Sequence, residues 1–187
     1  MNLEMLDEPD IEKVKSAIIG DGYFFGYIPD KGFDFILENF RELKNMGVLE
    51  NNWMDAYSHS NNFSHVPLQT LKEIFDTCDS AILQEQYPIY VGDHFSSGKR
   101  FSLFRGCAGD DHRIGMSWTS SLDKAIWYAA HHAECNDLGN LAVYTTVVER
   151  GDIYCCGNHY DYDFIVCPKE VWRVIVPEKE FRIDRPR

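Results

Sequence analysis

The sequence predicts an α+β protein in which a helical N-terminal portion packs on a strand-rich C-terminal portion. Two observations carry this prediction. Apolar residues recur at helical spacing in the first half, whereas stretches rich in Val, Ile, Tyr and Phe, broken by Gly, Pro and Asp, dominate the second. We therefore divide the 187 residues into a helical portion, 1–95, and a strand-rich module, 96–187. Together they are long enough for one compact unit with a real core.

The first half contains two apolar stripes that repeat every three or four residues, as on one face of a helix. Pro67 precedes the second stripe and marks a helix start. Polar, turn-rich stretches separate the stripes. The expected elements are a short helix over 9–18, an aromatic-lined turn region over 20–32, a helix from Phe33 to Met46, a loop over 58–65 and a helix from Leu68 to Ile82.

In the second half the β-branched and aromatic stretches predict five strands. The expected strands are 100–106, 141–148, 152–156, 164–168 and 171–176. Between the first two, residues 122–134 have a helical pattern. Ser120, with Asp123 three residues later, matches a capping box. The buried stripe of this helix is expected to comprise Leu122, Ala125, Ile126 and Ala129.

Composition excludes several classes of protein. Apolar residues make up 44% of the chain and aromatic residues 14%, which is typical of a globular protein. The N-terminus is acidic where a secretory signal needs positive charge, and no apolar run is long enough to cross a bilayer. We therefore expect a cytoplasmic protein with no membrane partner, whose six cysteines are thiols.

The negative charge is concentrated in the first half. Residues 1–95 hold 17 acids and 6 Lys or Arg, a net charge of −11, whereas residues 96–187 hold 13 acids and 12 Lys or Arg, a net charge of −1. Binding to nucleic acid requires clustered cations, so the acidic half is not expected to bind a phosphate backbone. It is either a soluble acidic face or a surface for a basic partner.

Three short motifs carry candidate chemistry. Arg105 ends a predicted strand, Ser117-Trp118-Thr119 comes just before the embedded helix, and Asp161 and Asp163 flank a tyrosine ahead of a buried strand. Each has a structural explanation of its own: a surface ion pair for the arginine, a helix cap for the hydroxyls, a turn for the acids. Their order gives them a different meaning.

This order resembles the ADP-ribosyltransferase family, in the branch defined by Arg, Ser-Thr-Ser and Glu-x-Glu. The resemblance covers the second half of the chain and does not extend to residues 1–95. It implies a split β-sandwich and a mono-ADP-ribosyltransferase that cleaves NAD, its substrate, at the bond between nicotinamide and ribose. The ADP-ribose then passes to a macromolecular acceptor, which we expect to be a protein.

The resemblance also implies a role for each motif. Arg105 and the adjoining Gly106 would bind the dinucleotide, since a planar guanidinium matches phosphate. Asp163 would be the catalytic acid, because a fixed carboxylate favours the oxocarbenium-like sugar left by nicotinamide. Asp161 would receive or orient the acceptor, and Ser117 would orient Asp163.

The resemblance also assigns Thr119, Trp118 and Trp127 to the cofactor site, although the two tryptophans have a second interpretation. Thr119 would complete the cofactor site, and Trp118 or Trp127 would cover nicotinamide; helical periodicity equally allows both tryptophans to be core residues. The hydroxyl motif also has a second register, Thr119-Ser120-Ser121. We prefer Ser117 because the capping box already uses Ser120.

Both acids are Asp where the family pattern has Glu, so each carboxylate lies one methylene closer to the backbone. This departure motivates two alternatives: a non-catalytic interaction protein on the same scaffold, whose acidic half binds a basic partner, and an NAD glycohydrolase that uses water as acceptor.

The histidines and cysteines also allow metal or thiol chemistry. A zinc site can be drawn from His131 or His132, Cys135, Cys155 or Cys156, and His159, but these residues lack paired Cys-x2-Cys spacing. Buried thiols and surface imidazoles explain them better, so no metal is expected. A Cys-His nucleophile has no helix-start or Gly-rich setting in its favour.

Overall fold

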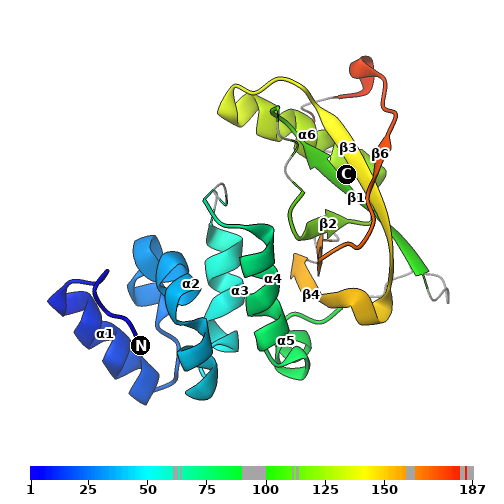
Figure 1. Ribbon diagram of the computed structural model, residues 1–187. Coiled ribbons are helices and arrows are strands. Elements are labelled where there is room, and N and C mark those ends of the chain that lie inside the picture. The colour runs from blue at the N-terminus through cyan, green and yellow to red at the C-terminus, as the bar shows by residue number, and fades with distance from the viewer. Residues whose placement is uncertain are drawn as a thin grey trace. The chain divides into compact units, whose positions relative to one another are not determined.

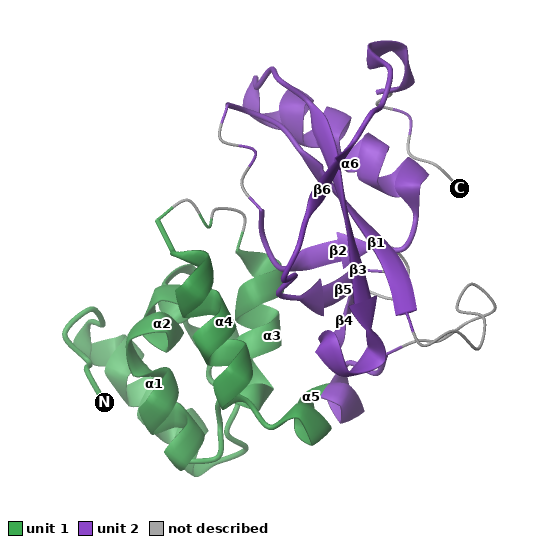
Figure 2. Cartoon of the chain, turned by 45° about the vertical axis from the view of Figure 1, so that its right-hand side comes forward, with its two compact units in different colours: residues 1–83 green, residues 84–187 purple. Residues whose placement is uncertain are grey.

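The computed structural model describes residues 1–60, 63, 65–89, 100–110, 112, 114–158, 163–181 and 184. The chain divides into two compact units, unit 1 (Met1–Leu83) and unit 2 (Gln84–Arg187), shown in different colours in Figure 2. The expected α+β class is confirmed: the described residues form six α-helices and a six-stranded antiparallel sheet. None of the described helices is both long and apolar enough to cross a membrane.

Unit 1 is helical (Figure 1). Its helices are α1 (Glu8–Ile19), α2 (Pro29–Asn45), α3 (Glu50–His59), α4 (Leu68–Thr77) and α5 (Ser80–Gln86), the last of which runs across the boundary with unit 2. The predicted helices over 9–18 and from Phe33 are confirmed. The single helix expected from Leu68 to Ile82 is wrong, because Cys78 adopts extended dihedrals that end α4 before α5 begins. Helix α3 was not predicted.

The core of unit 1 is built around Trp53 of α3, which is completely buried. Its indole stacks on Phe33 of α2 at 5.8 Å between ring centroids and meets Phe75 of α4 edge-on at 5.4 Å. Aromatic pairs at these separations stabilise a core beyond the area that they bury. Trp53 therefore joins three helices.

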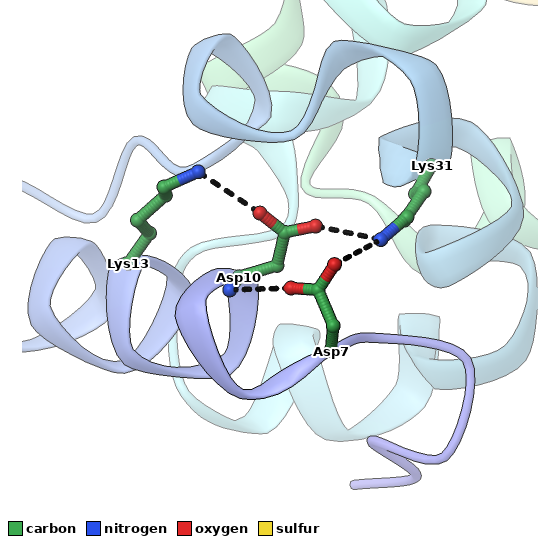
Figure 3. A network of polar contacts seen from close by, with 4 residues as sticks. All are labelled: Asp7, Asp10, Lys13 and Lys31. Atoms are coloured by element: carbon green, nitrogen blue, oxygen red, sulfur yellow. Dashed lines mark hydrogen bonds and ion pairs between the residues drawn. The ribbon is translucent and has the colours of Figure 1, made fainter.

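Ion pairs fasten α1 to α2 (Figure 3). Lys31 Nζ of α2 lies 2.7 Å from Asp10 Oδ2 and 3.2 Å from Asp7 Oδ2, while Lys13 Nζ lies 3.0 Å from Asp10 Oδ1. Asp7 also caps α1 by accepting the backbone N–H of Asp10. The two lysines hold the pKa of Asp10 below its usual value. These acids thus have structural partners within unit 1.

The described residues of unit 2 form one sheet with strand order β4-β5-β2-β1-β3-β6 and one long helix, α6 (Leu122–Asn136). The strands are β1 (Arg100–Cys107), β2 (Ser117–Thr119), β3 (Ala142–Glu149), β4 (Ile153–Asn158), β5 (Asp163–Val166) and β6 (Trp172–Val174). Five of these correspond to the five predicted strands, with ends shifted by a few residues. The very short β2 is the strand-like part of the hydroxyl motif.

The sheet is weakest between β1 and β2. Eight residue pairs join β1 to β3, whereas a single pair, Phe104 with Thr119, joins β1 to β2. Three further pairs join β2 to β5. The sheet therefore consists of two three-stranded halves that part from each other on one side of this pair.

The two faces of the sheet are packed differently. Leu103 of β1, Trp118 of β2 and Phe164 of β5 belong to an apolar cluster on one face. Helix α6 packs on the other face over β1, which it approaches so closely that a Cβ on Gly106 would lie 2.0 Å from the carbonyl oxygen of Ala125. Since side chains alternate between the faces of a strand, Arg105 leaves β1 on the face of the apolar cluster.

Candidate functional site

Three adjacent strands carry the candidate site. Strand β2 lies between β1, which holds Arg105, and β5, which begins at Asp163. The topology therefore brings the arginine, the hydroxyls and one acid, far apart in the sequence, into three consecutive strands. Arg105 and Asp163 nevertheless leave opposite faces of the sheet, so the structure does not bring their side chains together over one face. About 10 Å, two strand spacings, separates the backbones of β1 and β5.

The guanidinium of Arg105 lies where β1 and β2 part. Its Nη1 donates a 2.7 Å hydrogen bond to the carbonyl oxygen of Ser117. Its Nε is buried and has no hydrogen-bond partner among the described residues. An unsatisfied buried donor costs about 1–3 kcal/mol, and such a cost needs an explanation. The surface ion pair that the sequence allowed for Arg105 does not account for this buried donor.

Thr119 and Asp163 form the second element of the site. They are directly opposite each other on β2 and β5, so their side chains project from the same face of the sheet. The carboxylate also lies over β4, where a Cβ on Gly157 would be 3.1 Å from Asp163 Oδ2. Strand β4 is tied to this position because Cys156 Sγ donates to the Asp163 carbonyl oxygen at 3.1 Å.

The structure changes the register of the hydroxyl motif. Ser121, not Ser120, caps α6: its Oγ accepts the backbone N–H of Lys124 at 3.2 Å. The expected capping box at Ser120 is therefore wrong, and the preference for Ser117 loses its basis. Ser117 is opposite Ile165, one diagonal step from Asp163, a separation of about 7–8 Å. Thr119 is the hydroxyl beside the acid.

The other predicted cofactor residues are Trp118, Gly106 and Trp127, and the structure gives each of them a packing role within unit 2. Trp118 is 1% exposed, lies in the apolar cluster and donates its Nε1–H to the carbonyl oxygen of Gly115 at 3.0 Å. Gly106 provides the close approach of α6 to β1. Trp127 stacks on His131, on the side of α6 opposite the buried Ala125 and Ala129. Trp118 is opposite Phe164, so it leaves the sheet on the face away from Asp163.

Asp161 and His159 lie outside the described residues. The cysteines that the zinc reading drew on are separated: Cys135 is exposed on α6, whereas Cys155 and Cys156 are buried in β4. Within the part of the chain that the structure describes, no group of three or more His, Cys, Asp or Glu side chains is placed to hold a metal ion.

Burial and charge shift three titratable groups near the site. Burial raises the pKa of the Cys107 thiol, and the Arg105 cation opposes this shift. Burial, with the charges of Cys156 and Asp163, raises the pKa of Cys155. Partial desolvation, with the positive charge of Arg105, lowers the pKa of His132. The buried thiols are therefore protonated at neutral pH, and neither is a thiolate nucleophile.

Two glycines of the site were not recognised from the sequence. A Cβ on Gly115 would lie 2.8 Å from Arg105 Nη2, just as a Cβ on Gly157 would crowd Asp163. Each charged group is thus seated against a residue without a side chain. Gly157 lies one residue beyond the strand expected over 152–156, but within the observed β4, where a glycine marks a close approach.

Comparison with models of protein families, with curated proteins and with solved structures found no match to this chain.

Proposed function

We propose that unit 2 is a mono-ADP-ribosyltransferase that cleaves NAD between nicotinamide and ribose and transfers ADP-ribose to a protein acceptor. The observation that carries the proposal is the position of β2. It lies between β1 and β5, with the Arg105 guanidinium bonded to its Ser117 carbonyl and with Thr119 opposite Asp163. Cation, hydroxyl and carboxylate follow the order that the family resemblance implies.

The dinucleotide would lie across the parting of β1 and β2. Arg105 starts on one face of the sheet and Asp163 projects from the other, so a ligand that contacts both must pass the point where a single residue pair joins the strands. The weak junction between two half-sheets also supports the split arrangement expected for this family. A phosphate would bind the guanidinium of Arg105, and the buried Nε would gain a phosphate partner only through a shift of this side chain on binding.

Asp163 would act at the other end of the substrate. As nicotinamide leaves with the electrons of its bond to ribose, positive charge develops on the sugar. A carboxylate hydrogen-bonded to a ribose hydroxyl stabilises this charge more in the transition state than in the ground state. Thr119, across the strand pair, would hold the carboxylate in place. Gly157 lets the acid sit low over β4, which suits a side chain one methylene shorter than Glu.

The test is to incubate the full chain with NAD labelled in its adenylate part and a cell lysate, measuring protein label and free nicotinamide. We expect both with the wild type and neither with Asp163→Asn. Asp123→Asn is the matched control, since Asp123 is an exposed acid in the first turn of α6. Nicotinamide without protein label would identify an NAD glycohydrolase. Neither product, with no NAD binding by calorimetry, would overturn the proposal in favour of a non-catalytic interaction protein.

A further inference from the structure

Three side chains four residues apart form a column on α6, away from the alanine stripe that packs on β1. The imidazole of His131 stacks on the indole of Trp127, with 4.8 Å between ring centroids and 9° between planes. On the next turn, Cys135 Sγ lies 3.7 Å from His131 Nε2 and 3.8 Å from Nδ1. His131 and Cys135 are both exposed. Neither residue takes part in the proposed NAD chemistry.

We propose that His131 and Cys135 chelate a divalent cation of the zinc class. Imidazole nitrogen and thiolate sulfur are the ligands that such ions prefer, whereas calcium and magnesium require oxygen. Residues four apart lie on one face of a helix, the spacing by which helical histidine pairs bind zinc. The pair is therefore a bidentate site on a single rigid element.

The distance between the two ligand groups fits this role. With zinc–sulfur bonds of about 2.3 Å, zinc–nitrogen bonds of about 2.0–2.1 Å and a tetrahedral angle, the two ligand atoms lie about 3.5 Å apart. The separations of 3.7 and 3.8 Å are already close to this value. Since Sγ is nearly equidistant from both ring nitrogens, the imidazole must turn about its Cβ–Cγ bond to direct a lone pair at the ion. The ring is exposed on its other side, and the turn takes it out of its parallel stack on Trp127.

This site differs from the zinc site that the sequence allowed. It uses neither Cys155 nor Cys156, which are buried in β4. Since the described residues offer no third ligand of this kind, water fills the other two positions. The ion displaces the thiol proton, so that one proton passes to the buffer for each ion bound and no electron is transferred.

The test is a titration of the full chain with Co²⁺, followed by competition with Zn²⁺. We expect a thiolate-to-cobalt charge-transfer absorption that saturates at one ion per chain and disappears when Zn²⁺ is added. Cys135→Ser should abolish this absorption, and His131→Gln should weaken binding at least tenfold. Binding should also change the tryptophan fluorescence, and Trp127→Phe should remove that change.

Two matched variants control the titration. Cys167→Ser removes another incompletely buried thiol, and His132→Gln removes the imidazole next to His131; both should bind Co²⁺ as the wild type does. A charge-transfer absorption that survives in Cys135→Ser, or a wild type without saturable binding, would overturn the proposal. The result is independent of NAD turnover, so it does not depend on the proposed function.

Discussion

Thr119 and Asp163 are directly opposite each other on β2 and β5, which makes threonine the hydroxyl neighbour of the candidate catalytic acid. If Thr119 positions the carboxylate, Thr119→Val should lower kcat for nicotinamide release about tenfold with little change in KM, because valine keeps the shape and removes the hydroxyl. Ser117→Ala is the comparison, since Ser117 is opposite Ile165, and should lower kcat less. Equal losses of kcat in the two variants, or a greater loss with Ser117→Ala, would contradict this role of Thr119 and favour Ser117 as the hydroxyl that orients Asp163.

Arg105→Lys tests the phosphate-binding role of the guanidinium. Lysine keeps the charge but lacks the fork of donors, so the Kd for NAD should rise at least tenfold by calorimetry. Arg100→Lys is the matched control because Arg100 is an exposed residue on the same strand, 3.6 Å from Glu149. Its Kd should stay within twofold of the wild type. Unchanged NAD affinity in Arg105→Lys would remove Arg105 from the site.

Gly106→Ala tests the close packing of α6 on β1. The new Cβ would lie 2.0 Å from Ala125 O and 2.5 Å from Ala129 N, so helix and strand must separate. Overpacking of this kind costs about 1–3 kcal/mol, and contact with backbone atoms places this variant at the upper end. In Gly139→Ala, where nothing lies within 4 Å, the free energy of unfolding should change by less than about 0.5 kcal/mol. Urea unfolding measures both; equal stabilities would contradict the packing.

Tyr23 makes the stability of unit 1 depend on pH. Burial, together with the hydrogen bond that its hydroxyl donates to Asp55 Oδ2 at 2.8 Å, raises the pKa of Tyr23 to about 12. A raised folded-state pKa means that the folded chain holds the proton more tightly. This stabilisation is complete below pH 10, near the unfolded pKa, and is lost as pH rises toward 12.

Comparison with Tyr23→Phe isolates this effect, because the other tyrosines and the lysines titrate in both proteins. Between pH 10 and 12 the wild type should lose on the order of 1–2 kcal/mol more unfolding free energy than Tyr23→Phe. Denaturant unfolding at several pH values measures the difference. Parallel pH profiles would show that Tyr23 ionises equally easily in both states.

The alternation and composition of the strands were readable from the sequence, because β-branched residues and their Gly and Pro boundaries act locally. Helix α3 was not. Its sequence begins Glu50-Asn51-Asn52, and asparagine has low helix propensity. The helix is stabilised by tertiary contacts, such as those of Trp53 with two other helices and of the Asn52 side chain, which bonds the backbone of Phe24 and Val48.

Only the local features of the candidate site could be predicted from the sequence. Residue types and their order along the chain suggested Arg105 and Asp163. Which hydroxyl faces the acid depends on the register of β2 against β5, and which serine caps α6 depends on where β2 ends. Both are set by long-range pairing that a local pattern does not contain. The burial of Trp118 follows from the same pairing, which directs it to the apolar cluster.

The most direct test of the central claim is the amount of free nicotinamide that the purified chain forms from NAD, measured by chromatography against time. We predict steady release by the wild type, a rate lower by at least a hundredfold for Asp163→Asn, and an unchanged rate for Asp123→Asn. Equal rates for the wild type and Asp163→Asn, or no nicotinamide from any of the three, would contradict the claim that Asp163 acts on NAD.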